Sequence, residues 1–179
     1  VSVGEARLAM RLVRGLAERE PATAVVLTTT TASAQAIVRD AVGRETARES
    51  IVVTFCPFDL SWMMRRFLDA VRPAAIVILE TEVWPNLLQI AEARRVPVLV
   101  VNARLSDRSF PAYRRSRLFL RSTFARITRC LAQTEEHARR FRAIGADAAR
   151  VRVTGNMKFD LEAPAVSSDN REAMTHFRA

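Results

Sequence analysis

The hydrophobic pattern at the start of the chain alternates between helical and strand spacing. Apolar residues recur there every three to four positions, at Ala9, Leu12, Val13 and Leu16. This spacing predicts a helix over Ala6–Glu18, and Pro21 marks its end. The β-branched run Thr23–Thr31 then predicts a strand. The chain therefore opens on a helix followed by a strand.

The same alternation continues to the end of the pattern. Further helices are predicted over Ala32–Val42, Leu60–Val71, Leu87–Arg95, Tyr113–Ala125 and Glu135–Ile144. Further strands are predicted over Ile51–Phe55, Ala75–Glu80, Pro97–Asn102, Ile127–Ala132 and Val151–Thr154. Repeated strand–helix units whose strands are apolar on both faces favour a parallel sheet with helices on each side. We therefore predict a doubly wound, Rossmann-like α/β fold, with Gly145 as a helix C-terminal cap.

The length and composition favour one main domain. A chain of 179 residues that is 49% hydrophobic can bury one substantial core. We expect this domain to span 1–160, and 161–179 to be a linker toward a further domain. The first helix of such a fold follows a strand, of which the sequence holds only Val1–Val3. We therefore expect the first strand to be largely missing, so that the chain is a piece of a longer protein.

Charge and cysteine content narrow the classes of partner. The net charge of +9 comes almost entirely from arginine, because Lys158 is the sole lysine. An excess of positive charge favours anionic partners without selecting among nucleic acid, phospholipid and phosphorylated glycolipid. Cys56 and Cys130 form no metal-binding spacing, so we expect two small core residues in a reducing compartment. The apolar runs Ala74–Leu79 and Val96–Val101 are too short to span a bilayer.

Polar residues that end a strand deserve most weight, because ligands of open parallel sheets bind at the carboxyl ends of the strands. The segment Ser2–Glu5 carries Gly4 for a tight turn and places Glu5 at the start of a helix. Backbone N–H groups and the helix dipole favour a negative charge there, so Glu5 is a candidate proton acceptor. The alternative is an acid that only complements the dipole.

Two further strand ends carry chemically capable side chains. Glu80 and Glu82 follow an apolar strand on one side of it, where a buried carboxylate is costly unless it is paired or used. Asn102 and Arg104 follow the next strand, where an amide and a guanidinium suit hydroxyls or a phosphate. The alternative for Asn102 and Arg104 is a network that only braces the loop. Trp84 and Pro85 are expected to shape a turn and start a helix.

Three other segments are candidates for binding. Lys158 lies in the glycine-containing loop Gly155–Asp160 after the last predicted strand. The hydroxyl run Thr28–Ser33, in which we single out Thr28, offers contacts to a sugar. A basic stretch interleaved with aromatic residues is either a solvated helix face or a surface for an anionic membrane. Its arginines are Arg104, Arg108, Arg114, Arg115, Arg117, Arg121, Arg126 and Arg129.

A series of motifs in this order resembles the family of 3-deoxy-D-manno-octulosonic acid (Kdo) transferases that extend the lipid A precursor. The motifs are SVGE at Ser2–Glu5, P-x-D at Pro57–Asp59, RFL at Arg66–Leu68, ETEVWPN at Glu80–Asn86, NARLS at Asn102–Ser106 and GNMKFD at Gly155–Asp160. The resemblance implies the amino-terminal, acceptor-binding half of a GT-B glycosyltransferase, which acts on the cytoplasmic face of the bacterial inner membrane. The donor CMP-Kdo would bind a second domain.

The resemblance also implies roles for particular residues. Glu5 matches the general base that deprotonates a glucosamine hydroxyl of the precursor, lipid IVA, so that Kdo transfers with inversion. Glu82, Glu80 and Lys158 match supporting catalytic positions, while Ser2, Gly4, Thr28, Asn102 and Arg104 are expected to contact substrate. No cofactor and no metal is required. We expect the chain by itself to be inactive.

Two other readings remain open from the sequence. A different GT-B enzyme, such as a sugar-nucleotide epimerase, would share the alternation of strands and helices but not the pairing of SVGE with ETEVWPN. A basic binding module would explain the charge, but no nucleic-acid-binding motif is present and the aromatic residues form no stacking platform. We therefore expect no nucleic acid partner.

Overall fold

The protein is an α/β molecule in which strands and helices alternate throughout. The computed structural model describes residues 3–44, 50–80 and 84–157. The helices in these ranges are α1 (Val3–Arg19), α2 (Ala32–Gly43), α3 (Ser61–Val71), α4 (Pro85–Ala93), α5 (Phe110–Arg115), α6 (Arg117–Ala125) and α7 (Glu135–Ile144). The strands are β1 (Val25–Thr29), β2 (Ile51–Phe55), β3 (Ile76–Leu79), β4 (Val98–Ala103), β5 (Arg129–Ala132) and β6 (Val151–Val153). Every strand pairing is parallel, as predicted.

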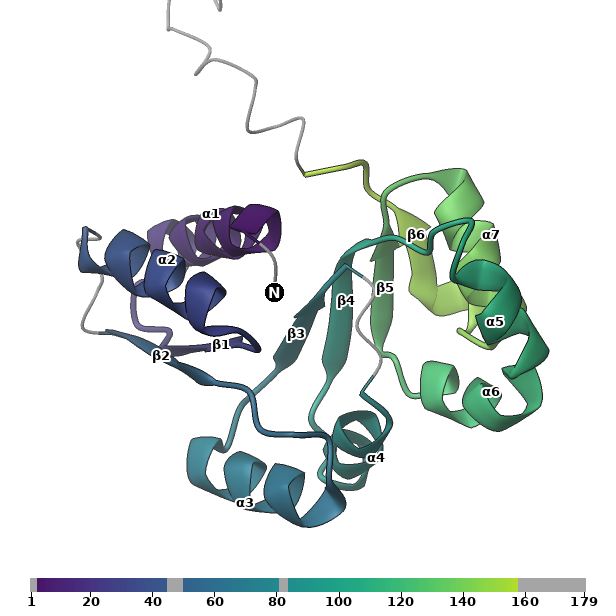
Figure 1. Ribbon diagram of the computed structural model, residues 1–179, viewed down its shortest axis with the longest axis horizontal. Helices are drawn as coiled ribbons and strands as arrows, with labels where there is room; N and C mark the ends of the chain where they lie inside the picture. The colour runs from purple at the N-terminus through teal and green to yellow at the C-terminus, as the bar shows by residue number, and fades with distance from the viewer. Residues whose placement is uncertain (1–2, 45–49, 81–83, 158–179) are drawn as a thin grey trace, which may run out of the picture.

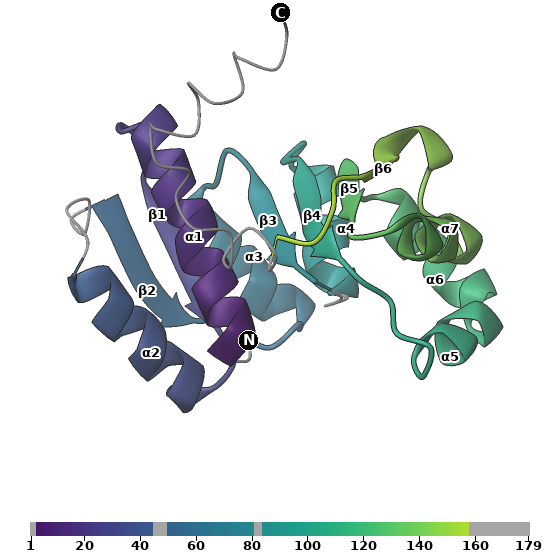
Figure 2. The same cartoon turned by 90° about the horizontal axis from the view of Figure 1, so that it is seen from above.

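The strands form two sheets among the described residues rather than the single sheet that we predicted. One sheet is the pair β1–β2, and the other has the order β3-β4-β5-β6. Figure 1 shows β1 and β2 on one side of the molecule and β3 to β6 on the other, and Figure 2 shows the same separation from above. We call the first sheet with α1 and α2 the small layer, and the second sheet with α3 to α7 the large layer.

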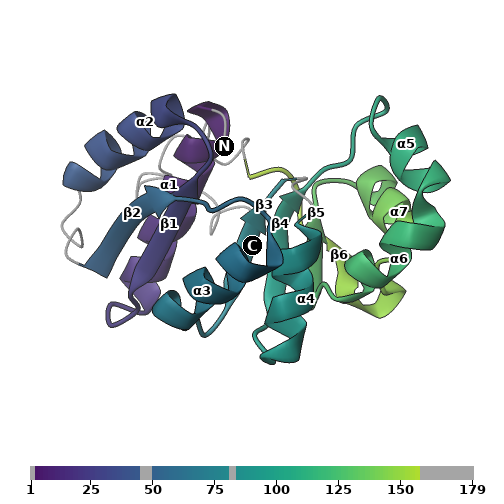
Figure 3. The ribbon, with the colours of Figure 1, turned by 60° about the horizontal axis from the view of Figure 1, so that its bottom comes forward.

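Each layer has its own hydrophobic core. In the small layer, Ala6, Met10 and Val13 of α1 pack with Val38 and Val42 of α2 over the β1–β2 pair. The large layer has a more extensive core whose largest fully buried side chains include those of α6 and α7. Figure 3 shows α1 and α2 beside β1 and β2, with α3 and α4 below β3 and β4.

Both sheets have some exposed side chains on the face that points away from their core. Ile78 and Val100 are paired neighbours that face the core, whereas Val77 on the opposite face of β3 is 46% exposed. In the small layer, Val26 and Val52 are likewise paired and exposed, at 36% and 56%. The prediction of strands buried on both faces is therefore wrong for β1, β2 and β3, and holds best for β4.

Local sequence signals account for most element ends. Pro85 occupies the first turn of α4, where its missing N–H costs nothing. Gly145 caps α7 with a φ of 124°, as expected, and a Cβ there would lie 2.7 Å from the Cα of Arg121. The helix predicted over Tyr113–Ala125 is instead two helices, because the chain turns at Ser116, whose ψ is 11°.

The described residues also test two of the simpler expectations. None of their helices is both long and apolar enough to cross a membrane. Cys130 is fully buried in the core of the large layer and Cys56 is half-buried against that core, and neither forms a disulfide within the described residues.

Candidate functional site

The carboxyl ends of the large-layer strands carry an unusual backbone. Glu80 follows β3 with a φ of 61°, and Asn102 near the end of β4 has a φ of 54°. Residues other than glycine seldom adopt this left-handed conformation, and those that do cluster at functional sites. Because Leu79 pairs with Val101, the two left-handed residues lie at the same level on neighbouring strands. Gly155, after β6, has a φ of 86° at the same edge.

Asn102 joins three of these strand ends through hydrogen bonds. Its side-chain Oδ1 accepts from the backbone N–H of Met157 at 3.1 Å, and its backbone oxygen accepts from Nε2 of Gln133 at 3.1 Å. Gln133 follows β5, and its own N–H donates to the oxygen of Ala103. Asn102 and Gln133 are 1% and 8% exposed. The brace that we considered for Asn102 is therefore present, and its Oδ1 is occupied within the chain.

The loop that follows Asn102 is held by α7. Nδ1 of His137 accepts from the N–H of Leu105 at 3.4 Å, and Nη1 of Arg140 donates to the Leu105 oxygen at 2.6 Å. Arg140 also pairs with Asp107, and its guanidinium lies 5.4 Å from the centre of the Phe110 ring. The hydrogen bond to Asp107, above all, raises the pKa of Arg140. This loop starts with Arg104, whose side chain is exposed at the rim of the strand ends.

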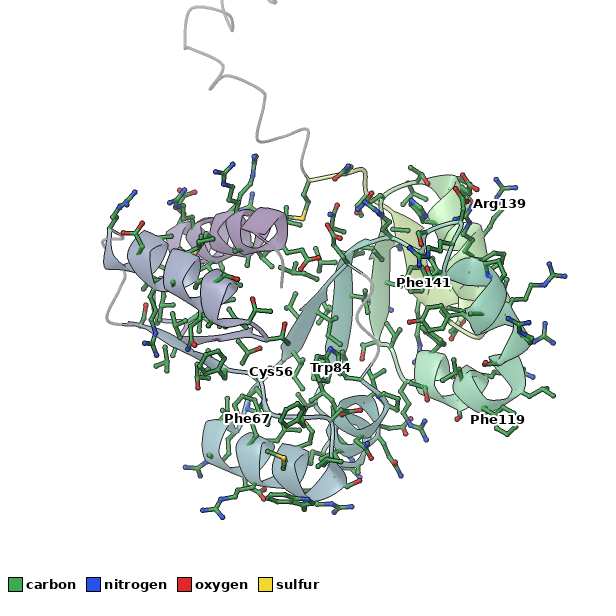
Figure 4. The ribbon with its side chains drawn as sticks, viewed as in Figure 1. Cys56, Phe67, Trp84, Phe119, Arg139 and Phe141 are labelled. Atoms are coloured by element: carbon green, nitrogen blue, oxygen red, sulfur yellow. The ribbon has the colours of Figure 1, made fainter. Side chains whose placement is uncertain are left out.

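Two motifs that are far apart in sequence meet at the start of α4. The carboxylate of Asp59 accepts from the backbone N–H groups of Asn86 and Leu87 at 3.0 and 2.9 Å. The Asn86 side chain donates back to the Asp59 oxygen at 2.6 Å and accepts from the Ser61 hydroxyl at 2.6 Å. The P-x-D motif thus caps the helix that begins within ETEVWPN. In Figure 4, Trp84 lies in the middle of the molecule at the same end of α4.

Glu5 and Thr28 belong to the small layer. Glu5 is half-buried in the first turn of α1, as predicted. Thr28 is half-buried near the end of β1, and Thr31 caps α2 by accepting from the N–H of Ala34. Thr29, the residue after Thr28, is 1% exposed. The hydrogen bonds given above join Asn102 to the ends of β5 and β6, and none of them reaches Glu5 or Thr28.

Several predicted site residues cannot be placed. Ser2, Glu82 and Lys158 lie outside the described residues, and Gly4 is described only as backbone of α1. Their roles therefore stay predictions. Within ranges 3–44, 50–80 and 84–157, no group of three or more histidine, cysteine, aspartate or glutamate side chains is arranged to hold a metal ion.

Sequence reasoning missed three residues that organise this edge. Each of them contacts a segment more than thirty residues away. Gln133 contacts Asn102, whereas His137 and Arg140 both contact Leu105. A histidine on a predicted helix gives no signal of such a partner. Gln133 directly follows the predicted strand Ile127–Ala132. Polar residues directly after other predicted strands were chosen as candidates, so the same rule would have indicated Gln133.

The fold and the strand-end network define a parallel, Rossmann-like α/β domain with its polar residues at the carboxyl edge. The family described as "3-Deoxy-D-manno-octulosonic-acid transferase (kdotransferase)" matches residues 1–161. The chain therefore belongs to this family, and the resemblance inferred from the motifs is confirmed.

Similar proteins from several bacteria carry matching names. A 3-deoxy-D-manno-octulosonic acid transferase of Bordetella pertussis is 39% identical over 92% of this chain and 37% of its own length. A transferase of the same name from Haemophilus influenzae is 32% identical over 89% of this chain and 36% of its own length. A bifunctional glycosyltransferase/methyltransferase of Fusobacterium nucleatum is 29% identical over 77% of this chain. The chain thus spans little more than a third of the first two relatives.

Proposed function

We propose that this chain is the acceptor-binding part of an inverting glycosyltransferase that moves Kdo from CMP-Kdo to the lipid A precursor lipid IVA in lipopolysaccharide core biosynthesis. The observation that carries this proposal is the family match over 1–161. The edge described above supports it, because two left-handed residues and a buried amide network gather where parallel sheets bind ligands.

In this proposal Glu5 is the general base. Its carboxylate removes the proton from a glucosamine hydroxyl, and the freed oxygen attacks the anomeric carbon of Kdo. The bond between that carbon and the phosphate oxygen breaks, and CMP leaves with the electron pair, so the configuration inverts. Glu5 lies at the amino terminus of α1, which favours a negative charge. The carboxylate of Glu5 therefore stays ionised and can take up the proton.

Other predicted residues support the charges that develop. Lys158 meets the negative charge that grows on the leaving phosphate, and Glu82 or Glu80 positions the acceptor or balances the oxocarbenium-like cation. Arg104, which is exposed at the rim, is suited to a phosphate of the acceptor. Ser2, Gly4 and Thr28 stay predicted contacts to the acceptor. The scheme needs no cofactor and no metal.

The acceptor is a lipid, and we propose that α5 and α6 rest on the anionic cytoplasmic face of the inner membrane. Leu118 and Phe119 are 85% and 84% exposed, and Figure 4 shows Phe119 pointing away from α6. Exposed arginines surround them, and Arg114 and Arg115 line a hollow of about 360 Å³ with Phe110. Exposed apolar residues among arginines suit a bilayer surface with anionic lipids.

Sedimentation with vesicles tests this surface. Changing Leu118 and Phe119 to serine should abolish binding to vesicles that contain anionic phospholipid. Val52→Ser, which also removes an exposed apolar side chain but lies in the small layer, is the matched control and should bind as before. Binding that survives the loss of Leu118 and Phe119 would place the contact elsewhere.

Activity is tested in a chimera, because the proposal assigns the binding of CMP-Kdo to sequence beyond this chain and expects the chain alone to be inactive. Residues 1–161 would replace the matching segment of the Bordetella pertussis relative. The chimera should transfer Kdo from CMP-Kdo to lipid IVA, and Glu5→Gln should lower kcat by at least about 100-fold, the usual contribution of a general base. Glu18→Gln on the same helix is the control.

The chimera experiment distinguishes a wrong transferase function from a wrong assignment of the general base. A chimera that folds but transfers no Kdo would contradict the proposed function. A chimera in which Glu5→Gln keeps kcat within a few-fold of the parent would contradict the assignment of the base while leaving the transferase function intact.

A further inference from the structure

Asn102 connects parts of the large layer that the sheet itself does not connect. Strand β5 lies between β4 and β6, so Asn102 on β4 and Met157 beyond β6 are not neighbours in the sheet. The side chain of Asn102 nevertheless accepts a hydrogen bond from the Met157 N–H at 3.1 Å. Gln133, which follows β5, lies in between and holds the backbone oxygen of Asn102. The three strand ends are thus tied together by one amide side chain and its support.

The backbone of β4 is distorted at the residue that makes this connection. The register between β4 and β5 shifts between Val100 and Ala103, and Asn102 in that interval has a φ of 54°. An irregularity of this kind re-aims a side chain, and it is often found beside active sites. Asparagine is among the few residues that tolerate the left-handed conformation. The distortion therefore allows Asn102 to reach across β5.

The burial of Asn102 shows that the connection comes at a cost. The residue is 1% exposed, and its Nδ2 is buried without a hydrogen-bond acceptor in the described part of the chain. A buried amide with an unpaired donor is unfavourable, so an apolar residue would suit a purely structural position better. The side-chain amide makes its hydrogen bond through Oδ1, which accepts from the backbone of the loop after β6.

We propose that Asn102 is a positioning residue for the reaction, with Gln133 as its support. By fixing the N–H of Met157, Asn102 sets the point from which the chain continues into Lys158, the next residue. This inference rests on the proposed function, in which Lys158 meets charge on the leaving phosphate. It assigns Asn102 an action through the loop, in place of the contact with substrate that the sequence predicted.

Two consequences distinguish positioning from a general structural role. A displaced charge near the leaving group weakens an interaction made in the transition state, so kcat should fall while KM changes little. A misplacement of about 1 Å lowers the rate by about 100-fold. The loss of kcat should also depend on the hydrogen bond between Asn102 and Met157. A variant that keeps an acceptor oxygen at position 102 should therefore keep the loop in place.

The experiment uses the chimera and two independent readouts. Asn102→Gly removes the side chain while accepting the left-handed backbone, and Asn102→Asp retains an oxygen for the Met157 N–H. Gln133→Met removes the supporting donor at similar volume. Gln35→Met is the matched control, because Gln35 is also a buried glutamine, 4% exposed, but lies in the small layer. The readouts are kcat and KM with lipid IVA, and amide hydrogen exchange of the segment that contains Met157.

We expect Asn102→Gly to lower kcat by about 100-fold and to deprotect the Met157 amide, with exchange of β4 unchanged. Asn102→Asp should preserve the protection of the Met157 amide and lose less of kcat than Asn102→Gly, although its buried carboxylate lowers stability. Gln133→Met should show the same losses as Asn102→Gly in weaker form, and Gln35→Met should show neither. Deprotection with an unchanged kcat, or an unchanged Met157 amide in Asn102→Gly and Gln133→Met, would overturn the inference. An inactive parent chimera would contradict the proposed function instead, and the exchange data would still decide whether Asn102 holds the loop.

Discussion

The two layers differ in how their parts are held together. The small layer rests on a hydrophobic core of α1, α2 and two strands. The large layer has a larger core and, in addition, side chains that reach from one segment to the backbone of another, as Asp59, Asn102 and Arg140 do. Apolar contacts set how helices and strands pack, whereas polar braces between distant segments fix the positions of individual atoms.

This difference bears on the proposed chemistry, because the two layers supply different groups. The proposed base Glu5 comes from the small layer, whereas Asn102 and the loop before Lys158 come from the large layer. In the large layer, hydrogen bonds fix the place of Asn102 and of the start of that loop. The position of Glu5 relative to them depends on how the small layer packs.

The largest expected effect comes from truncating one buried methionine in each of the two cores. Met10 in the small layer and Met64 in the large layer are 4% and 1% exposed. Met→Ala at either site should lower the free energy of unfolding by about 2–5 kcal/mol. Because the cores are separate, Met10→Ala should accelerate hydrogen exchange in α1, α2, β1 and β2 only, and Met64→Ala should do so throughout the large layer.

Hydrogen exchange followed by mass spectrometry measures this directly in the full chain. If Met10→Ala accelerates exchange in β4 and β5 as strongly as in β1, the layers unfold as one unit and the comparison fails. Leu118→Ala, at a side chain that is 85% exposed, is the control and should leave exchange unchanged.

A smaller effect is expected from one polar brace of the large layer. Asp59→Ala removes the carboxylate that accepts from the N–H groups of Asn86 and Leu87, and so it uncaps α4. Loss of such a cap costs about 0.5–2 kcal/mol. Asp69→Ala is the matched control, because Asp69 makes an exposed ion pair with Arg94 at 2.7 Å, a type worth about 0–1 kcal/mol.

Urea unfolding of the two variants gives the answer. Equal losses for Asp59→Ala and Asp69→Ala would show that the brace adds nothing beyond surface charge. A loss confined to Asp59→Ala would show that the junction of the P-x-D and ETEVWPN segments stabilises the large layer.

The sequence was a good guide to the elements and a poor guide to their partners. Hydrophobic periodicity placed the strand Ile51–Phe55 and the helix Glu135–Ile144 at their observed bounds, because those signals are local. The break at Ser116 carries no glycine or proline, so the pattern merged α5 with α6. The separation into two sheets depends on long-range pairing, which periodicity does not report.

The candidate site divides in the same way. Strand-end position was enough to single out Glu80 and Asn102, and both have the rare left-handed backbone. What Asn102 does was left open between binding and bracing, because its partner Met157 lies 55 residues away. Contacts at such a separation follow from the order of the strands, which only the structure supplies.

The smallest expected effect at neutral pH concerns the two thiols. Burial in the large layer raises the pKa of Cys130 from 9.0 to about 12, against a weaker opposing effect of Arg142. Because the thiolate is the reactive form, Cys130 should resist a thiol reagent in the folded chain, while the half-buried Cys56 reacts first. The folded state holds the Cys130 proton more tightly than the unfolded state does. Its contribution to stability is therefore complete below pH 9 and declines as the pH rises toward 12.

That decline should be at most about 1.4 kcal/mol per pH unit. Unfolding measured between pH 8 and about 10.5, where thiols in unfolded chains titrate, separates the two cysteines. Cys130→Ala should lose part of the dependence on alkaline pH that the parent shows, and Cys56→Ala should retain it. If Cys130 instead reacts as fast as Cys56 at pH 8, the core of the large layer opens as readily as its half-buried edge at Cys56. The inference that the core of the large layer stays closed would then be wrong, because a thiol at the centre of that core can react only when the core opens.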